Sequence, residues 1–302
     1  MLPDPLSFRP VRPADKERVI AFTLNTWGDD EDDYIKDVFD EWVADPHGPF
    51  TAAVLDGQVV GIAKLTDRGD DEWWLEGLRI DPAYRRQGIA REFNRHHLEQ
   101  VKRLGGRVVR YMTGGENAGS QAIGARAGFQ HIITYRAYLA GVSDEFPLPA
   151  ALSDDDVPRL AQWIDSPLMR YLHGVYRDGW SARTLTEAEL QRVVAAKLVY
   201  GLKDARSNLT AWALLRSEEF DDDSEDSEPH RLRVDHLDGE PSAITELAGQ
   251  MRAFAAVRRR SIVSAGVGDY PPVLAALQAA GYALDERHPG LWVLELKLAD
   301  AA

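Results

Sequence analysis

The residues whose types and spacing best suit chemistry lie in one stretch, residues 75–90, which reads L-E-G-L-R-I-D-P-A-Y-R-R-Q-G-I-A. Bulky and β-branched residues predict a strand over Trp73–Ile80, and Pro82 ends it because proline has no N–H for a sheet ladder. Two arginines and Gly88 then precede a helical pattern that runs to about Leu104. The first N–H groups of a helix lack intrahelical partners and attract negative charge, so this basic turn predicts a site for a phosphate-containing ligand.

The motif Arg85-x-x-Gly88-x-Ala90, which follows I-D-P, resembles the pyrophosphate loop of the GNAT (Gcn5-related) N-acetyltransferases, where the pattern is Arg/Gln-x-x-Gly-x-Gly/Ala. A second stretch agrees, because Asn117 and Gly128 have the spacing of the family segment that follows its fifth strand. The resemblance implies an acyltransferase that uses acetyl-CoA as co-substrate and needs no metal.

The same resemblance assigns contacts to the co-substrate. Its acetyl and pantetheine end is expected along the backbone of the strand, its pyrophosphate at the basic turn, and its arm at the helix that Asn117 begins. The expected contact residues are Leu78, Arg79, Ile80, Arg85, Arg86, Gln87, Gly88, Ile89, Ala90 and Asn117.

Glu76 is the candidate general base, because related enzymes often carry a glutamate on this strand, upstream of the co-substrate contacts. An exposed or arginine-paired strand carboxylate is an equally good interpretation. Simple alternation groups Glu76 with Leu78, unless a bulge breaks the count. The family's usual proton donor to the departing thiolate is a tyrosine, and Gly124 stands in its place. Tyr84 and Tyr111 are possible replacements, each of which also suits a structural role; the predicted catalytic residues are Glu76 and Tyr84.

The acceptor is expected at the segment between the first two predicted helices. An unbroken acidic run lies there between two aromatic residues, which suits a cationic amine through charge and cation–π attraction. The predicted acceptor-binding residues are Trp27, Asp29, Asp30 and Tyr34. A solvated acidic loop is the competing interpretation.

The elements that must position these residues follow the order β-α-α-β-β-β-α-β-α-β, which predicts a mixed sheet with helices on its faces. The clearest local signal is a hairpin around Asp56-Gly57. The predicted strands are 8–12, 50–55, 58–65, 73–80, 107–113 and 130–139, and the predicted helices are 14–27, 34–44, 87–104 and 117–127.

The second half repeats this order, so the fold class is α/β with a mixed sheet and two tandem GNAT-like domains. The predicted limits are 1–140 for the first domain, 141–150 for a linker and 151–302 for the second domain. In the second half the turn Asp238–Ser242 holds two acids, a proline and no arginine. Carboxylates repel a pyrophosphate, so this domain is predicted to be degenerate and to wall the acceptor site or replace a dimer partner.

Composition limits the remaining possibilities. The chain of 302 residues has a formal net charge of −14, which argues against a nucleic-acid partner. It has no cysteine, so disulfides, thiolate nucleophiles and cysteine-ligated zinc are excluded. The acidic run Glu218–Glu228 suits a solvated loop. With no apolar run long enough for a membrane span and no secretory pattern, we expect a cytoplasmic monomer or homodimer without membrane contact.

Together these features predict an acetyl-CoA-dependent N-acetyltransferase that acts on the primary amine of a small, cationic molecule. An acyl-CoA-binding regulatory or scaffold protein without turnover is the alternative, since Gly124 removes the usual tyrosine. A protein-modifying acetyltransferase differs from the first prediction only in its acceptor. A dinucleotide-binding enzyme is disfavoured, because no G-x-G-x-x-G follows a strand.

Overall fold

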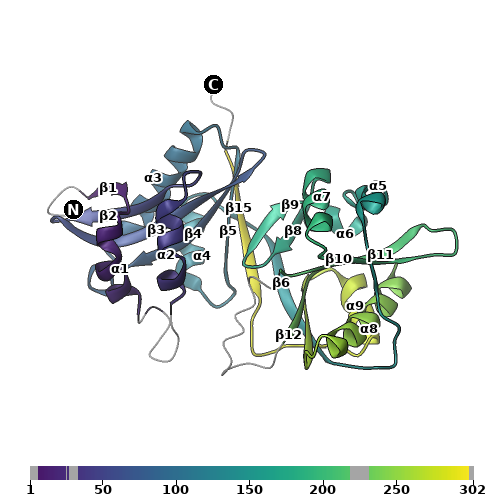
Figure 1. Cartoon of the computed structure of the whole chain (residues 1–302). Coiled ribbons are helices and arrows are strands. Elements are labelled where there is room, and N and C mark those ends of the chain that lie inside the picture. The colour runs from purple at the N-terminus through teal and green to yellow at the C-terminus, as the bar shows by residue number, and fades with distance from the viewer. Residues whose placement is uncertain (1–5, 25, 27–32, 218–230, 299–302) are drawn as a thin grey trace. The chain divides into compact units, whose positions relative to one another are not determined.

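The computed structural model describes residues 6–24, 26, 33–217 and 231–298 (Figure 1). Contacts divide the chain into two compact units that are interleaved along the sequence. Unit 1 comprises residues 1–111, 117–131 and 294–302, and unit 2 comprises residues 112–116 and 132–293. The domain limits predicted from sequence stay a prediction.

Unit 1 has the predicted order of strands and helices. Its strands run in the order β1-β2-β3-β4-β5-β15, and β4 and β5 form a parallel pair among otherwise antiparallel neighbours from β1 to β4. The strands are β1 (Ser7–Pro10), β2 (Phe50–Leu55), β3 (Gln58–Gly69), β4 (Glu72–Ile80), β5 (Val108–Gly114) and the last residues of β15 (Leu291–Lys297). The helices are η1 (Pro13–Asp15), α1 (Lys16–Thr23), α2 (Ile35–Ala44), η2 (Pro82–Tyr84), α3 (Ile89–Arg103) and α4 (Ala118–Arg126).

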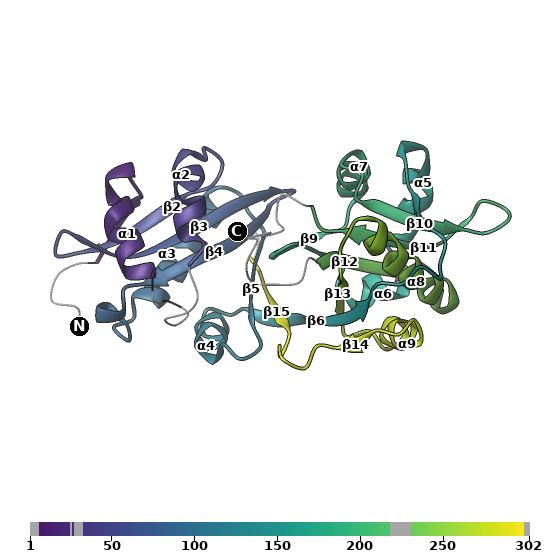
Figure 2. The same ribbon diagram turned by 60° about the horizontal axis from the view of Figure 1, so that its bottom comes forward.

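The helices of unit 1 lie on opposite faces of its sheet (Figure 2), and an apolar cluster holds them on each face. One cluster joins α1 and α2 to the sheet through Phe22, Phe39 and Ile62. The other joins α3 to the sheet through Ile89 and Phe93. The β2–β3 hairpin turns at Asp56 and Gly57, whose φ values of 50° and 74° are those that a tight hairpin turn requires. A face of α1 and α2 and a face of α3 are therefore the two environments available to side chains of β4.

Unit 2 repeats this order after β6 (Gln130–Gly141), most of which belongs to it, with β8 and β9 inserted among its first helices. Its sheet runs β6-β13-β12-β11-β10-β7, β14 pairs with β6, and β8 and β9 form a separate two-stranded ribbon. The strands are β7 (Ala150–Ala151), β8 (Val175–Asp178), β9 (Ser181–Thr184), β10 (Val199–Lys203), β11 (Leu209–Leu215), β12 (Arg231–Gly239), β13 (Ile262–Gly268) and β14 (Ala283–Leu284). The helices are η3 (Asp154–Asp156), α5 (Val157–Leu160), η4 (Ala161–Trp163), α6 (Pro167–Tyr171), α7 (Glu187–Ala195), α8 (Pro241–Val257) and α9 (Pro271–Ala279).

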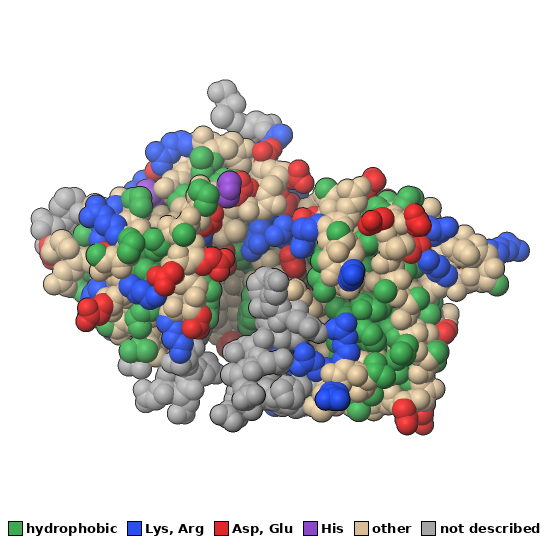
Figure 3. All heavy atoms as spheres, in the orientation of Figure 1, with side chains coloured by type: hydrophobic (Ala, Val, Ile, Leu, Met, Phe, Trp, Pro, Cys, Tyr) green, Lys and Arg blue, Asp and Glu red, His purple; other side chains and the backbone are tan. Residues whose placement is uncertain are grey.

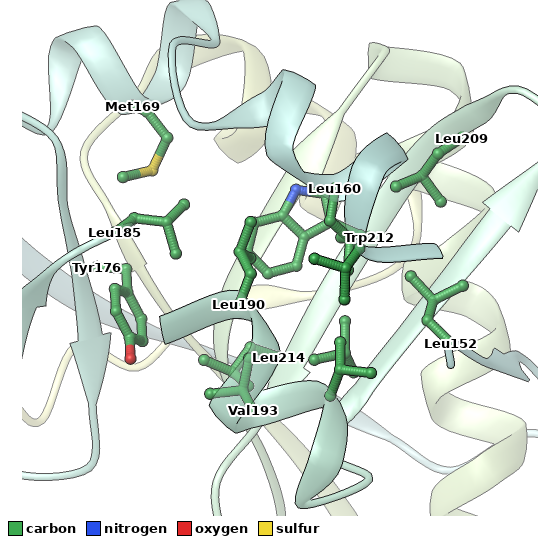
Figure 4. Close-up of a cluster of buried hydrophobic side chains, with 13 residues drawn as sticks. Leu152, Leu160, Met169, Tyr176, Leu185, Leu190, Val193, Leu209, Trp212 and Leu214 are labelled. Atoms are coloured by element: carbon green, nitrogen blue, oxygen red, sulfur yellow. The ribbon is translucent and has the colours of Figure 1, made fainter. Parts of the chain in front are cut away.

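The core of unit 2 contains elements that the sequence pattern did not predict. Trp212 of β11 is fully buried at its centre, with Leu160 and Leu190 around it (Figure 4). Helix α6 and strands β8, β9 and β10 are examples, since none of them has a clear period in the sequence. All of these elements are five residues or shorter, too short for a periodic pattern to stand out.

Acidic and basic side chains are interspersed on the face of unit 1 that Figure 3 shows. Within the part of the chain that the structure describes, no helix is long and apolar enough to cross a membrane. The predicted acidic loop at 218–228 lies outside the described residues.

Candidate active site

Strands β4 and β5 separate after a short paired segment. Their parallel register joins Glu72–Trp74 to Val108–Arg110, and among the described residues the ladder between them goes no further. Arg110 closes the apex of this opening, because its buried guanidinium lies 2.8 Å from Glu72 Oε1 and 2.7 Å from Glu295 Oε2. Beyond the apex, the edge of β4 therefore faces an opening rather than a paired strand.

A bulge in β4 decides which side chains border this opening. The register with β3 shifts between the pairs Lys64–Glu76 and Ile62–Arg79, so β4 has one residue more than β3 there. Gly77 has a φ of +65°, and a Cβ at this position would overlap the Trp42 ring of α2. The bulge therefore depends on glycine, both for its backbone conformation and for the approach of α2.

The bulge breaks the simple alternation along β4. Glu76 and Arg79 lie on the α2 face, where Glu76 accepts a hydrogen bond from Thr66 and Arg79 pairs with Asp33. Leu78 instead packs into the cluster beneath α3, as does Ile80. The bulge thus gathers the carboxylate and the guanidinium on one face.

The turn between β4 and α3 forms a basic, open anion site. Arg86 and Gly88 have φ values of +63° and +87°, and Gly88 begins α3 with no side chain capping the helix in the described structure. The side chains of Arg85, Arg86 and Gln87 are exposed. Helix N–H groups without a side-chain cap, beside two arginines, can donate hydrogen bonds to a phosphate group.

Three contacts fix the shape of this turn. Asp81 accepts the backbone N–H of Ala83 at 2.9 Å and forms an ion pair with Arg18 of α1. Arg85 Nε donates to the carbonyl of Ile80 at 3.1 Å, although the side chain as a whole is exposed. Ile89 is buried, whereas Ala90 is half-buried, so the first turn of α3 is anchored by one side chain.

Asn117 lies at the start of α4, where its Oδ1 accepts the backbone N–H of Ser120 at 3.0 Å. It is therefore an N-cap, and its Nδ2 amide is the group suited to donate to a pantetheine carbonyl. The fold thus gives this residue a structural role that the sequence pattern did not include.

Tyr111 of β5 occupies the space beside Gly124 of α4. Its hydroxyl donates to the carbonyl of Ser120 at 3.0 Å, and a Cβ at Gly124 would overlap that hydroxyl. Burial raises the pKa of the Tyr111 phenol to about 12, and the hydrogen bond with Ser120 offsets part of this rise. Tyr84 lies elsewhere, in η2, where its side chain packs against the cluster beneath α3.

The predicted acceptor residues are only partly described. Trp27, Asp29 and Asp30 lie outside the described residues, whereas Tyr34 precedes α2 and is 44% exposed. Asp33, the last acid of the run, is 2% exposed and bound to Arg79, so it is not available to a cationic acceptor.

His97 lies on the buried stripe of α3 and is itself buried, and its Nε2 has no hydrogen-bond partner in the described structure. Burial lowers the pKa of its imidazole to about 3, so the ring is neutral at ordinary pH.

Unit 2 has a matching pair of parallel strands, but its own side chains lie in the corresponding opening. Strands β12 and β13 pair through Val234 and Ala265 and no further among the described residues. Beyond that point, Arg177 lies against Gly266 and Leu172 against Gly268, where any Cβ would overlap them. The cavity that remains is about 10 Å³, room for a single water molecule.

A basic turn like that of unit 1 is also missing from unit 2. Only Glu240 separates the end of β12 from Pro241 at the start of α8, whereas residues 81–88 separate β4 from α3. Proline lacks an N–H, and Glu240 is acidic. The prediction of a degenerate second domain is therefore confirmed at the level of fold.

Residues 16–129 match the family model of the acetyltransferase (GNAT) family. The comparison with curated proteins found no match. Among solved structures, a putative acetyltransferase from Thermoplasma acidophilum is 17% identical with a TM-score of 0.58, over 97% of this chain and 100% of that one. A tandem GNAT protein from the clavulanic acid biosynthesis pathway is 14% identical with a TM-score of 0.56, over 99% and 100% of the two chains. A GCN5-related N-acetyltransferase from Sphaerobacter thermophilus is 11% identical with a TM-score of 0.63, over 98% and 97%. Residues 16–129 thus match the GNAT acetyltransferase family, and the chain as a whole has a tandem GNAT fold.

Proposed function

We propose that this protein transfers an acetyl group from acetyl-CoA to the primary amine of a small, cationic molecule. The match to the GNAT family implies acetyl-CoA-dependent acetyl transfer. The observation that carries the proposal for this chain is the open basic turn, with exposed Arg85 and Arg86 beside the uncapped start of α3. A cytoplasmic location and a monomeric or homodimeric state are part of the proposal.

The co-substrate residues divide by the chemistry they offer. The two arginines and the backbone N–H groups of residues 87–90 suit the pyrophosphate, and the peptide groups of residues 78–80 suit the amide-rich pantetheine arm. Asn117 would donate its side-chain amide from the start of α4. Bound acetyl-CoA supplies an acetyl group activated as a thioester.

Glu76 is the proposed general base. An acceptor ammonium must lose a proton before its nitrogen can attack, and a carboxylate on the edge of the opening can receive that proton directly or through water. The C–N bond then forms as the C–S bond breaks, while a backbone N–H of β4 polarises the carbonyl oxygen. The attacking nitrogen loses a second proton as the amide forms, and the departing thiolate gains one proton, so the products are the neutral amide and CoA as a free thiol.

Two tyrosines are candidates for the donor of that last proton. Tyr84 lies beside the pyrophosphate turn, and Tyr111 lies on β5, one residue beyond the last pair that β5 forms with β4. Tyr84 is the proposed donor, and Tyr111 is the second candidate, because its hydroxyl lies against α4 beside Gly124 and already donates its single proton to the Ser120 carbonyl at 3.0 Å. The acceptor side is proposed to include Trp27, Asp29, Asp30 and Tyr34.

Calorimetric titration with acetyl-CoA tests the cofactor site. Wild type should bind at one site per chain, and the double variant R85A/R86A should bind at least tenfold more weakly. The variant R95A/R103A is the matched control, because it removes two exposed charges from later turns of α3 and should leave affinity within twofold. Two sites per chain would contradict the assignment of unit 2, and absence of binding to wild type would remove the proposed function.

Consumption of the thioester separates the enzyme from a regulatory binder. Free CoA released from acetyl-CoA is followed with a panel of primary amines, and formation of the amide is checked by mass spectrometry. Amide formation that scales with enzyme concentration supports acetyl transfer. Tight acetyl-CoA binding without amide from any amine would favour an acyl-CoA-binding regulatory or scaffold protein instead.

A further inference from the structure

We propose that the Asp33–Arg79 ion pair positions the acceptor side of the site, and that the surface it holds, made by Tyr34, Glu76 and Thr66, receives the ammonium group of the acceptor. The inference rests on the proposed acetyl transfer. Beyond acetyl transfer itself, the inference names the residues that recognise the amine and the ion pair that holds these residues in place.

The ion pair joins two segments that are far apart in the sequence. Arg79 Nε donates to Asp33 Oδ2 at 2.5 Å and its Nη2 donates to Asp33 Oδ1 at 3.1 Å, a bidentate arrangement. Asp33 Oδ1 also accepts the backbone N–H of Ile35 at 3.1 Å, at the start of α2. Both partners are buried, at 2% and 7% exposure. The pair therefore fixes the start of α2 against the bulge of β4.

Tyr34 follows Asp33 directly and is held by this arrangement. Its ring lies 5.3 Å from the Arg79 guanidinium and 6.0 Å from the Trp42 ring, which it meets edge-on. These contacts limit the ring to one orientation, although 44% of the residue is exposed. The crowded hydroxyl end is desolvated, which raises the pKa of the phenol to about 12 despite the nearby Arg79.

Glu76 faces the same region from the residue before the bulge. Thr66 of β3 donates its hydroxyl to the Glu76 carboxylate, which sets the orientation of that carboxylate. Glu76 and Arg79 flank the bulge on the same face of β4, and the Tyr34 ring lies 5.3 Å from the Arg79 guanidinium, so the carboxylate and the ring border the same region. A half-buried carboxylate beside a partly exposed aromatic ring is an arrangement that attracts an organic ammonium ion.

A role in stability alone does not explain the pair well. Burying two charges removes their hydration, so such pairs contribute little net stability even when their geometry is good. What the pair does provide is specificity of arrangement, because a bidentate guanidinium–carboxylate contact fixes distance and direction together. Loss of the pair should therefore lower the affinity for the acceptor more than the affinity for the co-substrate.

The test compares variants of the full chain in binding and in turnover. Asp33→Asn and Arg79→Met break the pair, and Arg79→Lys keeps the charge without the bidentate contact. The probes are benzylamine, 1,4-diaminobutane and glucosamine, with benzyl alcohol as the uncharged analogue. Affinity for each probe is measured by calorimetry with CoA present, together with KM and kcat.

We expect at least a tenfold loss of amine affinity and a matching rise in amine KM for Asp33→Asn and Arg79→Met, with an intermediate effect for Arg79→Lys. The Kd of acetyl-CoA should stay within twofold, and benzyl alcohol should not bind. Arg9→Met is the control, because it breaks another bidentate pair of unit 1, with Asp15 at 2.6 and 2.8 Å. It should leave amine affinity unchanged.

Tyr34→Ala gives a second arm that does not break the pair, so a folding defect in the other variants leaves the idea testable. This variant too should lower the affinity for the probe amines at least tenfold. Unchanged amine affinity in these variants, equal loss of acetyl-CoA affinity, or no probe amine bound by wild type would each overturn the inference. Failure of the proposed function has a different signature, since wild type would then not bind acetyl-CoA at all.

Discussion

At Gly77, a single hydrogen atom in place of a side chain permits both the bulge and the packing of α2. Its φ of +65° is unfavourable for other residues, and a Cβ would overlap the Trp42 ring. We expect Gly77→Ala to lower the free energy of unfolding by about 2–5 kcal/mol, combining backbone strain with overpacking. Urea denaturation of the full chain measures this loss.

Gly57 supplies the comparison for that measurement. It has a similar φ of +74°, but nothing lies within 4 Å of the position that a Cβ would take. Gly57→Ala should therefore cost only the conformational part, about 1 kcal/mol. Equal losses in the two variants would show that the contact with Trp42 contributes nothing to the bulge.

His97 makes unit 1 sensitive to acid. Burial lowers the pKa of its imidazole from 6.5 to about 3, so between these values the unfolded chain binds a proton that the folded chain does not. Stability should therefore fall as the pH falls from 6.5 towards 3, by about 1.4 kcal/mol per pH unit, or about 2 kcal/mol at pH 5. The free energy of unfolding, measured across this pH range, should change less steeply with pH in His97→Leu than in wild type.

Unit 2 also has a buried histidine, but a nearby aspartate offsets its effect on the pH dependence of stability. Burial lowers the pKa of His236 to about 3 and raises the pKa of Asp238 to about 6. Between pH 6 and 4 the folded chain gains a proton at Asp238, so the two slopes have opposite signs. Hydrogen exchange at pH 5 should consequently show protection lost in α3 before α8, and the reverse order would contradict this account.

Tyr111 and Tyr84 can be separated by conservative variants. If Tyr84 donates the proton to the thiolate, Tyr84→Phe should lower kcat about 100-fold, the usual size of a general-acid contribution, and leave the Kd of acetyl-CoA unchanged. Steady-state kinetics with calorimetry measures both. The same loss in Tyr111→Phe, with Tyr84→Phe normal, would assign the role to Tyr111 instead.

At the scale of elements, the apex of the β4–β5 opening depends on one buried charge. Arg110 lies between Glu72 and Glu295, and all three side chains are at most 13% exposed. Arg110→Met leaves two carboxylates facing each other in the interior, so we expect a loss of about 3–5 kcal/mol. Thermal unfolding measures it.

The triple variant R110M/E72Q/E295Q is the matched control for the apex, because it removes the arginine together with both negative charges. It should recover most of the stability lost in Arg110→Met. A triple variant no more stable than the single one would mean that packing, rather than charge, holds the strands together at this point.

The sequence predicted the elements of unit 1 well because each signal there is local. Alternation and the Asp56-Gly57 turn place β2 and β3 within a few residues, and the basic turn before α3 is contiguous in the chain. The role of Asp33 could not be found in this way. Its partner Arg79 is 46 residues away and reaches it only because a bulge reverses the alternation of β4.

Other parts of the site depend on packing between elements, so local sequence patterns could not predict them either. Gly124 indicates that a side chain is missing, but only the fold shows the Tyr111 hydroxyl beside it. In unit 2, the acids at the turn predicted a lost phosphate site, whereas the placement of Leu172 and Arg177 against two glycines of β13 became visible only in the structure.

At the scale of the whole molecule, the repeat in the sequence and the compact units do not coincide. Two similar halves predict limits near residues 141–150, but residues 294–302 cluster with unit 1. Glu295 pairs with Arg110, and the Leu298 N–H donates to the Arg107 carbonyl at 2.8 Å. The last strand thus returns to the unit in which the chain begins.

This return makes a prediction about fragments. A chain of residues 1–140 lacks the C-terminal strand, so an edge of β5 is uncovered and the buried Arg110 guanidinium keeps Glu72 but loses Glu295, one of its two carboxylate partners. We expect it to be less stable than unit 1 in the full chain and prone to aggregate. The same fragment with residues 290–298 joined through a flexible linker should regain a cooperative unfolding transition and acetyl-CoA binding. Size-exclusion chromatography, urea unfolding and calorimetry decide the outcome: a soluble, cooperative 1–140 fragment with wild-type affinity would mean that the C-terminal strand is dispensable for the first domain.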